Sequence, residues 1–206
     1  MATKKLAGQY AWVIGGAGCI GTGLCRGLLR AGATVVVSSR HLQRLMALRE
    51  ELGFPDRLHT LNGSMLAGAS EETVEKAMEL TGGQLDHVVA HSAVRWWTSP
   101  AESDETTSGA LVAIPRGKLF DMSAEDFGDA AVQLPRLQFE AARLLLPRLT
   151  DARGDNQSTY TFVTGGSGEA GHPGVAQVNA QGVWGLAAAV RARIPSRALG
   201  APPGAL

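Results

Sequence analysis

A run of glycines near the N-terminus is the part of this sequence best suited to binding a ligand. It lies between an apolar, strand-like segment and a segment whose apolar residues recur at helical spacing. A glycine-rich turn at this point lets backbone N–H groups and a helix N-terminus approach a pyrophosphate closely. A turn that only packs a strand against a helix explains the same glycines, so both interpretations stay open. The residues of the run are Gly15, Gly16, Gly18, Cys19, Ile20 and Gly21.

A second set of polar residues, Ser167 and His172, follows a later strand-like segment. The run from Gly165 to Glu169 resembles the turn that carries a nucleophilic serine, but that turn requires a glycine where Glu169 stands. A serine hydrolase is therefore disfavoured. The 5 histidines show no compact spacing with cysteine, so no zinc site is predicted.

The composition argues against several classes of partner. Lys and Arg number 19 and Asp and Glu also number 19, so the formal net charge is zero. This balance disfavours nucleic acid and anionic membrane surfaces as partners. No apolar run approaches the ~20 residues that span a bilayer, and no targeting segment is visible. We expect a single domain over residues 1–206.

The 2 cysteines indicate the redox environment. Cys19 and Cys25 fall on one expected helix, about 9 Å apart along its axis and on different faces, so they cannot form a disulfide with each other. The sequence therefore predicts a reducing compartment, either the cytoplasm or the interior of an organelle.

Strand and helix patterns alternate along the chain. Apolar or β-branched runs predict strands at residues 9–14, 34–38, 59–61, 85–90, 160–164 and 197–201. Helices are predicted from the glycine run to residue 32, over residues 41–52, from Ser70 to Gly82, after Ser123 and over residues 179–193. Ser70 and Ser123 are expected to cap their helices, Pro135 to kink one, and residues 98–118 to form a surface loop or lid. This alternation predicts an α/β fold with a Rossmann-like, doubly wound parallel sheet and helices on both faces.

The glycine run resembles the TGxxxGxG fingerprint of the short-chain dehydrogenase/reductase family. The match begins at Ile14 and places the family glycines at Gly15, Cys19 and Gly21, so the middle glycine is lost. The resemblance covers nearly the whole chain, up to a stretch over residues 195–204 that is similar to the family's PIRVNxxxPG. It implies a Rossmann-like fold that is shortened at its C-terminus.

The resemblance also implies a nucleotide. Arg40 directly follows the second strand, where a basic residue in the family favours NADP(H) by pairing with the 2′-phosphate. Asn62 takes the place of the family's aspartate near the adenine, and Ala90 and His91 begin the stretch that replaces NNAG. A solvated arginine and a structural histidine are the competing interpretations.

The residues that transfer protons in the family have no counterpart here. The resemblance implies a catalytic Asn, Ser, Tyr and Lys, and these positions fall on Leu134, Gly166, Ala176 and Ala180. None of these side chains can supply a proton.

We therefore expect a pseudoenzyme that resembles a short-chain dehydrogenase, binds one or more protein partners in a larger assembly and retains NADP(H). The alternative is an NADPH-dependent carbonyl reductase whose proton donor is His91, Ser167 or His172. A regulator whose partner affinity changes with NADPH is a third hypothesis.

Overall fold

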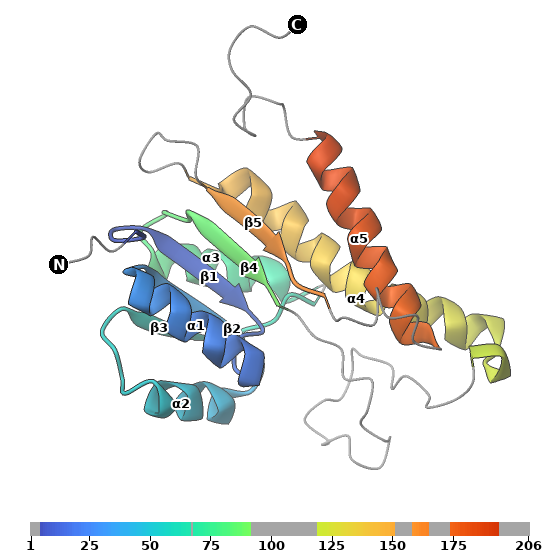
Figure 1. The fold of residues 1–206 in the computed structure, drawn as a ribbon, viewed down its shortest axis with the longest axis horizontal. Helices are drawn as coiled ribbons and strands as arrows, with labels where there is room; N and C mark the ends of the chain where they lie inside the picture. The colour runs from blue at the N-terminus through green and yellow to red at the C-terminus, as the bar shows by residue number, and fades with distance from the viewer. Residues whose placement is uncertain (1–4, 67, 92–118, 151–157, 165–173, 194–206) are drawn as a thin grey trace, which may run out of the picture. The chain divides into compact units, whose positions relative to one another are not determined.

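A computed structural model describes residues 5–66, 68–91, 119–150, 158–164 and 174–193 of the chain (Figure 1). Contacts group the chain into two compact units. Unit 1 contains residues 1–92, 140–163 and 195–206, and unit 2 contains residues 93–139 and 164–194. The expected single domain stays a prediction. The loop or lid expected at residues 98–118 and the strand expected at residues 197–201 lie outside the described residues.

Unit 1 is built on a parallel sheet of 5 strands in the order β3-β2-β1-β4-β5. All neighbouring pairs are parallel, and Trp12 of the central strand β1 lies opposite Val36 of β2 and Val88 of β4. The predicted doubly wound parallel sheet is thereby confirmed. The strands are β1 (Tyr10–Ile14), β2 (Thr34–Ser39), β3 (Leu58–Asn62), β4 (His87–Ala90) and β5 (Thr159–Phe162).

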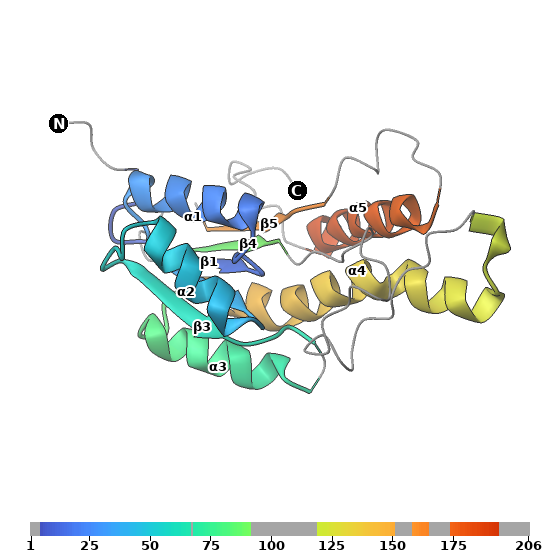
Figure 2. The same cartoon turned by 90° about the horizontal axis from the view of Figure 1, so that it is seen from below.

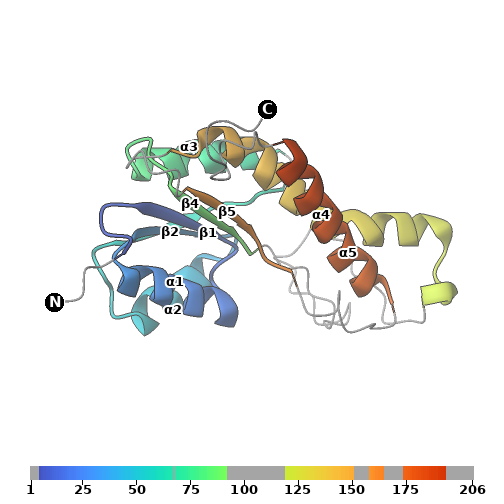
Figure 3. The same cartoon turned by 45° about the horizontal axis from the view of Figure 1, so that its top comes forward.

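Helices cover both faces of this sheet (Figures 2 and 3). On one face, α1 (Cys19–Ala31) and α2 (Leu42–Glu51) bury a cluster that includes Cys25, Val35 and Leu45. On the other face, α3 (Ser70–Leu80) and the last residues of α4 (Ala124–Leu145) bury a cluster that includes Trp12 and Leu145. Burial of both faces explains why the central strands are runs of apolar residues.

One predicted helix cap is wrong and another is confirmed. The N-cap of α3 is Ala69, whereas Ser70 is the first helical residue, is buried, and donates a 2.7 Å hydrogen bond to Glu140 at the end of α4. A tertiary partner thus replaces the local cap. At the start of α4, the Ser123 hydroxyl accepts a 3.0 Å hydrogen bond from the N–H of Asp126, as predicted.

In unit 2, the first part of α4 lies beside α5 (Val175–Arg193) (Figure 1). The sequence placed the start of this helix at Asn179, but α5 begins at Val175, directly after Gly174, whose φ is 120°. Two short 3₁₀ helices, η3 (Leu119–Asp121) and η4 (Leu146–Arg148), precede and follow α4.

Asn179 of α5 inserts its side chain into the hydrogen-bond ladder of α4. Its Oδ1 accepts a 2.9 Å bond from the N–H of Leu134, and its Nδ2 donates a 2.6 Å bond to the carbonyl of Ala130. In an uninterrupted helix these two backbone groups would bond each other. The next residue, Pro135, has no N–H, and a Cβ on Gly182 would lie 2.5 Å from the Pro135 ring. The kink predicted at Pro135 stays a prediction, but the ladder is interrupted there.

We predict that Asn179→Ala lowers the free energy of unfolding by about 2 kcal/mol, because two buried backbone groups of α4 lose their partners. Urea unfolding of wild type and variant measures this difference. Gln177→Ala, a substitution on the same helix, is the control and is expected to change stability by less than about 0.5 kcal/mol. Equal effects of the two substitutions would contradict the inserted-amide interpretation.

Candidate functional site

The glycine run forms a tight turn between β1 and α1. Gly15 has a φ of 69°, a left-handed conformation that favours glycine. A Cβ on Gly16 would lie 2.7 Å from methyl groups of Val13 and Val37. A Cβ on Gly21 would lie 2.1 Å from the carbonyl oxygen of Gly16, so α1 touches the turn backbone directly. Packing therefore excludes larger residues at Gly16 and Gly21, whereas the backbone conformation disfavours them at Gly15.

Gly18 differs from its neighbours because nothing lies within 4 Å of the place where a Cβ would stand. It is the N-cap of α1, its backbone is extended, and no side chain caps the helix. The first turn of α1 contains no acidic residue. The first N–H groups of a helix and its dipole favour an anion at such an end. The absence of a side chain at Gly18 leaves the approach to these N–H groups open.

A second glycine pattern, GxGxxG, is formed by Gly16, Gly18 and Gly21. The match to TGxxxGxG used Gly15, Cys19 and Gly21 and therefore missed it. In dinucleotide-binding turns the three glycines provide a tight turn, close approach to the pyrophosphate and close helix–strand packing. The crowding at Gly16 and Gly21 and the open space at Gly18 agree with these roles. Cys19, at the position of the lost family glycine, is exposed and leaves the turn intact.

Arg40 and Asn62 lie together beyond the ends of β2 and β3, where they line a pocket of about 320 Å³. The Asn62 amide donates a 3.3 Å hydrogen bond to the carbonyl of Arg40. Desolvation and the neighbouring positive charge of Arg44 both lower the pKa of Arg40. Both effects destabilise the charged guanidinium, and a bound anion would stabilise it. Two further residues that line this pocket, Lys76 and Glu72, form an ion pair at 2.6 Å.

His91 and Ala90 lie at the end of β4, next to the glycine turn. The backbone N–H of His91 bonds the carbonyl of Ile14 at 3.2 Å, and the His91 ring bonds the backbone of Gly15. Desolvation lowers the pKa of His91, and the bond to Gly15 opposes this shift. Ala90 is buried in the sheet.

Unit 2 contains three described residues at which the resemblance leads us to expect the family's catalytic positions, and this correspondence stays a prediction. Leu134 is buried in α4, and Ala176 and Ala180 belong to α5, where Ala180 is buried. Gly166 lies outside the described residues, as do Ser167 and His172. Among the described catalytic positions, none carries a group that can transfer a proton.

The part of the chain that the structure describes offers little other chemistry. Within it, no group of His, Cys, Asp and Glu could hold a metal ion, and no helix is long and apolar enough to span a membrane. Both cysteines are free thiols. Burial raises the pKa of Cys25 to about 12, so that thiol stays protonated.

Comparison with protein families gives one match. Residues 12–83 match the family described as NADP oxidoreductase, coenzyme F420-dependent. This segment contains the glycine turn, Arg40 and Asn62 but covers less than half of the chain. No curated protein matches the sequence.

Solved structures share the fold. A Pseudomonas syringae protein described as a short-chain dehydrogenase has a TM-score of 0.72 at 20% identity, over 94% of this chain and 74% of its own. The Pseudomonas aeruginosa RhlG/NADP active-site complex gives 0.67 at 20% identity, over 93% and 68%. A Brucella melitensis 3-ketoacyl-(acyl-carrier-protein) reductase complexed with NADH gives 0.68 at 18% identity, over 94% and 72%. The chain therefore has the fold of the short-chain dehydrogenase/reductases, as the resemblance predicted.

We predict that Gly21→Ala lowers the free energy of unfolding by about 3 kcal/mol, because the new methyl group collides with a backbone carbonyl. Gly18→Ala is the matched control, since its methyl group enters open space and extended backbone suits alanine. Its effect is expected to be below about 0.5 kcal/mol. Chemical denaturation of both variants measures the contrast, and a Gly21→Ala protein as stable as Gly18→Ala would refute the close approach.

Proposed function

We propose that this chain is a nucleotide-binding pseudoenzyme, which serves as a binding or structural subunit of a larger protein assembly. The observation that carries the proposal is a contrast between two sites. The glycine turn combines crowded positions with an open approach to the start of α1, as a dinucleotide requires. By contrast, Leu134, Ala176 and Ala180 stand where the resemblance places the residues that transfer protons. Binding is therefore the function that these residues support best.

NADP(H) is the nucleotide that the residues of unit 1 favour. The N–H groups at the start of α1, beside Gly18, would hold the pyrophosphate. Arg40 would pair with the 2′-phosphate of the adenosine ribose, and Asn62 lies in the same pocket for hydrogen bonding near the adenine. When bound, NADPH supplies a hydride. The neighbours described as NADP and NADH complexes support a nucleotide of this class.

Exposed aromatic side chains of unit 2 support a protein partner. Phe139 of α4 is 52% exposed and Trp184 of α5 is 51% exposed. The sequence of α5 has no charged residue from Val175 to Val190. The polar side chains of this stretch, such as Gln177 and Gln181, are uncharged, and aromatic residues are enriched in protein interfaces. The exposed Cys19 and the buried Cys25, both free, fit a reducing compartment for such an assembly.

The alternative function, a carbonyl reductase with an unusual proton donor, receives little support from His91. A general acid must be protonated when it acts, and desolvation lowers the pKa of His91, which disfavours the protonated ring. A regulator that responds to NADPH would use the same glycine turn. It differs from a passive scaffold in that NADPH would change the affinity for its partner.

We predict that calorimetric titration detects saturable NADPH binding to the purified chain, with NADH weaker. Arg40→Ala is expected to reduce NADPH affinity about tenfold and to leave NADH affinity unchanged, because only NADPH carries the 2′-phosphate. Gly18→Ala is expected to weaken both nucleotides, since its methyl group blocks the pyrophosphate. The control is Arg136→Ala, which removes an exposed arginine of α4 and is expected to leave both affinities unchanged. Failure of the folded wild type to bind either nucleotide would sink the nucleotide part of the proposal.

We also predict that, with aldehydes or β-keto thioesters present, the chain oxidises NADPH no faster than a sample without protein. The reason is that Leu134, Ala176 and Ala180, where the resemblance places catalytic residues, cannot donate a proton. Loss of NADPH absorbance measures this rate. Turnover that disappears in His91→Ala, Ser167→Ala or His172→Ala would instead establish the reductase and overturn the pseudoenzyme.

A further inference from the structure

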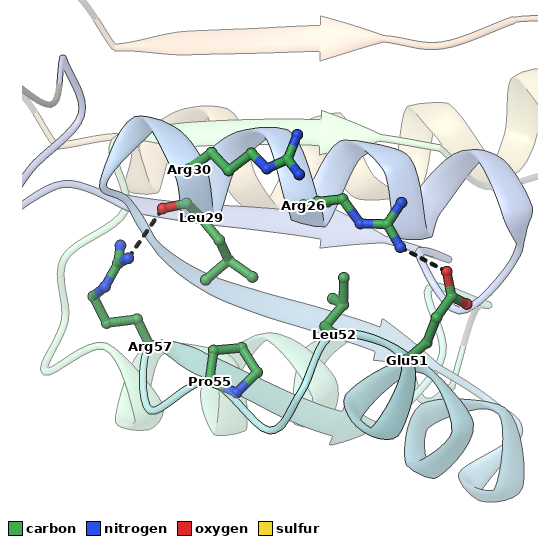
Figure 4. Close-up of a pocket in the computed structure, with 7 residues that line it drawn as sticks. All are labelled: Arg26, Leu29, Arg30, Glu51, Leu52, Pro55 and Arg57. Carbon is green, nitrogen blue, oxygen red and sulfur yellow. Dashed lines mark hydrogen bonds and ion pairs between the residues drawn. The ribbon is translucent and has the colours of Figure 1, made fainter.

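A groove of about 500 Å³ lies between α1 and α2, at the end of the sheet opposite the glycine turn (Figure 4). Because α1 and α2 run antiparallel to the strands, their C-terminal ends meet the amino ends of β2 and β3. The groove is therefore separate from the nucleotide site. We call it the α1–α2 groove. Its lining residues are Arg26, Leu29, Arg30, Glu51, Leu52, Pro55 and Arg57.

The charged residues of the groove are three arginines and one glutamate, in a chain whose net charge is zero. Arg57 is held in place, because its guanidinium donates to the carbonyls of Ala33 at 2.6 Å and Leu29 at 3.0 Å. It caps the C-terminal end of α1, where the helix dipole favours a cation. Arg57 is thus a fixed positive charge at one end of the groove.

Arg26 and Arg30 provide the positive charge that is available to a ligand. They are four residues apart on α1, so their side chains leave the same face and repel each other. Arg26 bonds Glu51 at 2.8 Å, but both side chains are solvent-exposed and the pair is weak. Arg30 has no ion pair among the described residues, and Figure 4 shows none at its guanidinium. An anion between the two arginines would relieve their repulsion.

An exposed aromatic residue with a strained backbone directly precedes the groove residue Pro55. Phe54 is 61% exposed and has a φ of 49°, which is rare for a bulky residue. Gly53 and Phe54 close a Schellman motif at the end of α2, with the Phe54 N–H donating to the carbonyl of Arg49 at 2.9 Å. That motif requires a left-handed backbone only at Gly53. Backbone strain such as that at Phe54 is concentrated at functional positions.

We propose that the α1–α2 groove docks an acidic peptide segment of a partner protein. A carboxylate of that segment binds between Arg26 and Arg30. A neighbouring apolar side chain packs on Leu52, Pro55 and the exposed ring of Phe54, which directly precedes Pro55. This proposal rests on the proposed role as a binding subunit, but not on nucleotide binding.

Three observations favour a peptide over other anions. The groove is open to solvent, whereas small-molecule sites enclose most of their ligand. The formal net charge of the chain is zero, whereas nucleic-acid-binding domains are usually strongly basic. Arginine and aromatic residues, here Arg30 and Phe54, are the residue types that dominate the energy of protein interfaces.

The experiment is a fluorescence anisotropy titration of the full chain with two labelled synthetic peptides. In the first peptide Asp and Glu alternate with Leu and Phe, and in the second every acidic residue is replaced by its amide. We expect saturable binding of the acidic peptide, with the amide peptide about tenfold weaker. Arg30→Glu is expected to weaken binding of the acidic peptide about tenfold, since it reverses the charge at the unpaired arginine.

One further test variant and three controls separate docking from folding and from the nucleotide site. Phe54→Gly removes the ring, and its backbone suits a φ of 49°, so binding should weaken several-fold with no loss of melting temperature. Arg136→Glu reverses an exposed arginine on α4 and should leave binding unchanged. Saturating NADPH, and Gly18→Ala, should also leave it unchanged, so failure of the nucleotide site is distinguishable. Equal affinity for the two peptides, wild-type affinity of Arg30→Glu, or no saturable binding would overturn the proposal.

Discussion

The contact between Gly21 of α1 and the carbonyl oxygen of Gly16 is the constraint on which the rest of unit 1 depends. A Cβ on Gly21 would come within 2.1 Å of that oxygen, so the helix can leave the turn in this direction only because position 21 has no side chain. This direction carries α1 back along the sheet and packs Cys25 and Leu29 against it. It also brings Ala31 and Gly32 to the start of β2, which pairs with β1.

The two ends of α1 differ in the groups that they offer to a ligand. Its N-terminus has unbonded N–H groups, no capping side chain and an open approach at Gly18, which together suit a phosphate. Its C-terminus is closed by Gly32 and by the Arg57 guanidinium, and the arginines nearby line the α1–α2 groove. One helix can therefore serve a nucleotide at the carboxyl end of the sheet and a partner at the amino end.

In unit 2, α4 and α5 pack together through residues at which the resemblance leads us to expect catalytic positions. The catalytic positions implied by the resemblance include Leu134, whose backbone N–H bonds Asn179 from α5. Ala180, the next residue, is buried, and Gly182 allows the Pro135 ring to approach α5 closely. Small residues and one buried amide therefore hold α4 and α5 together.

The sequence by itself determined the parallel sheet, its strands within one or two residues, and the position of the glycine turn, because these follow from local periodicity and from glycine's backbone freedom. The crowding at Gly16 and the open space at Gly18 depend on which atoms surround each glycine, and this is decided by the tertiary structure. Ser70 left its expected cap because Glu140, distant in sequence, bonds its hydroxyl. Asn179 and the α1–α2 groove were equally beyond prediction. Each combines groups from segments far apart in the chain, and only tertiary packing decides which of them meet.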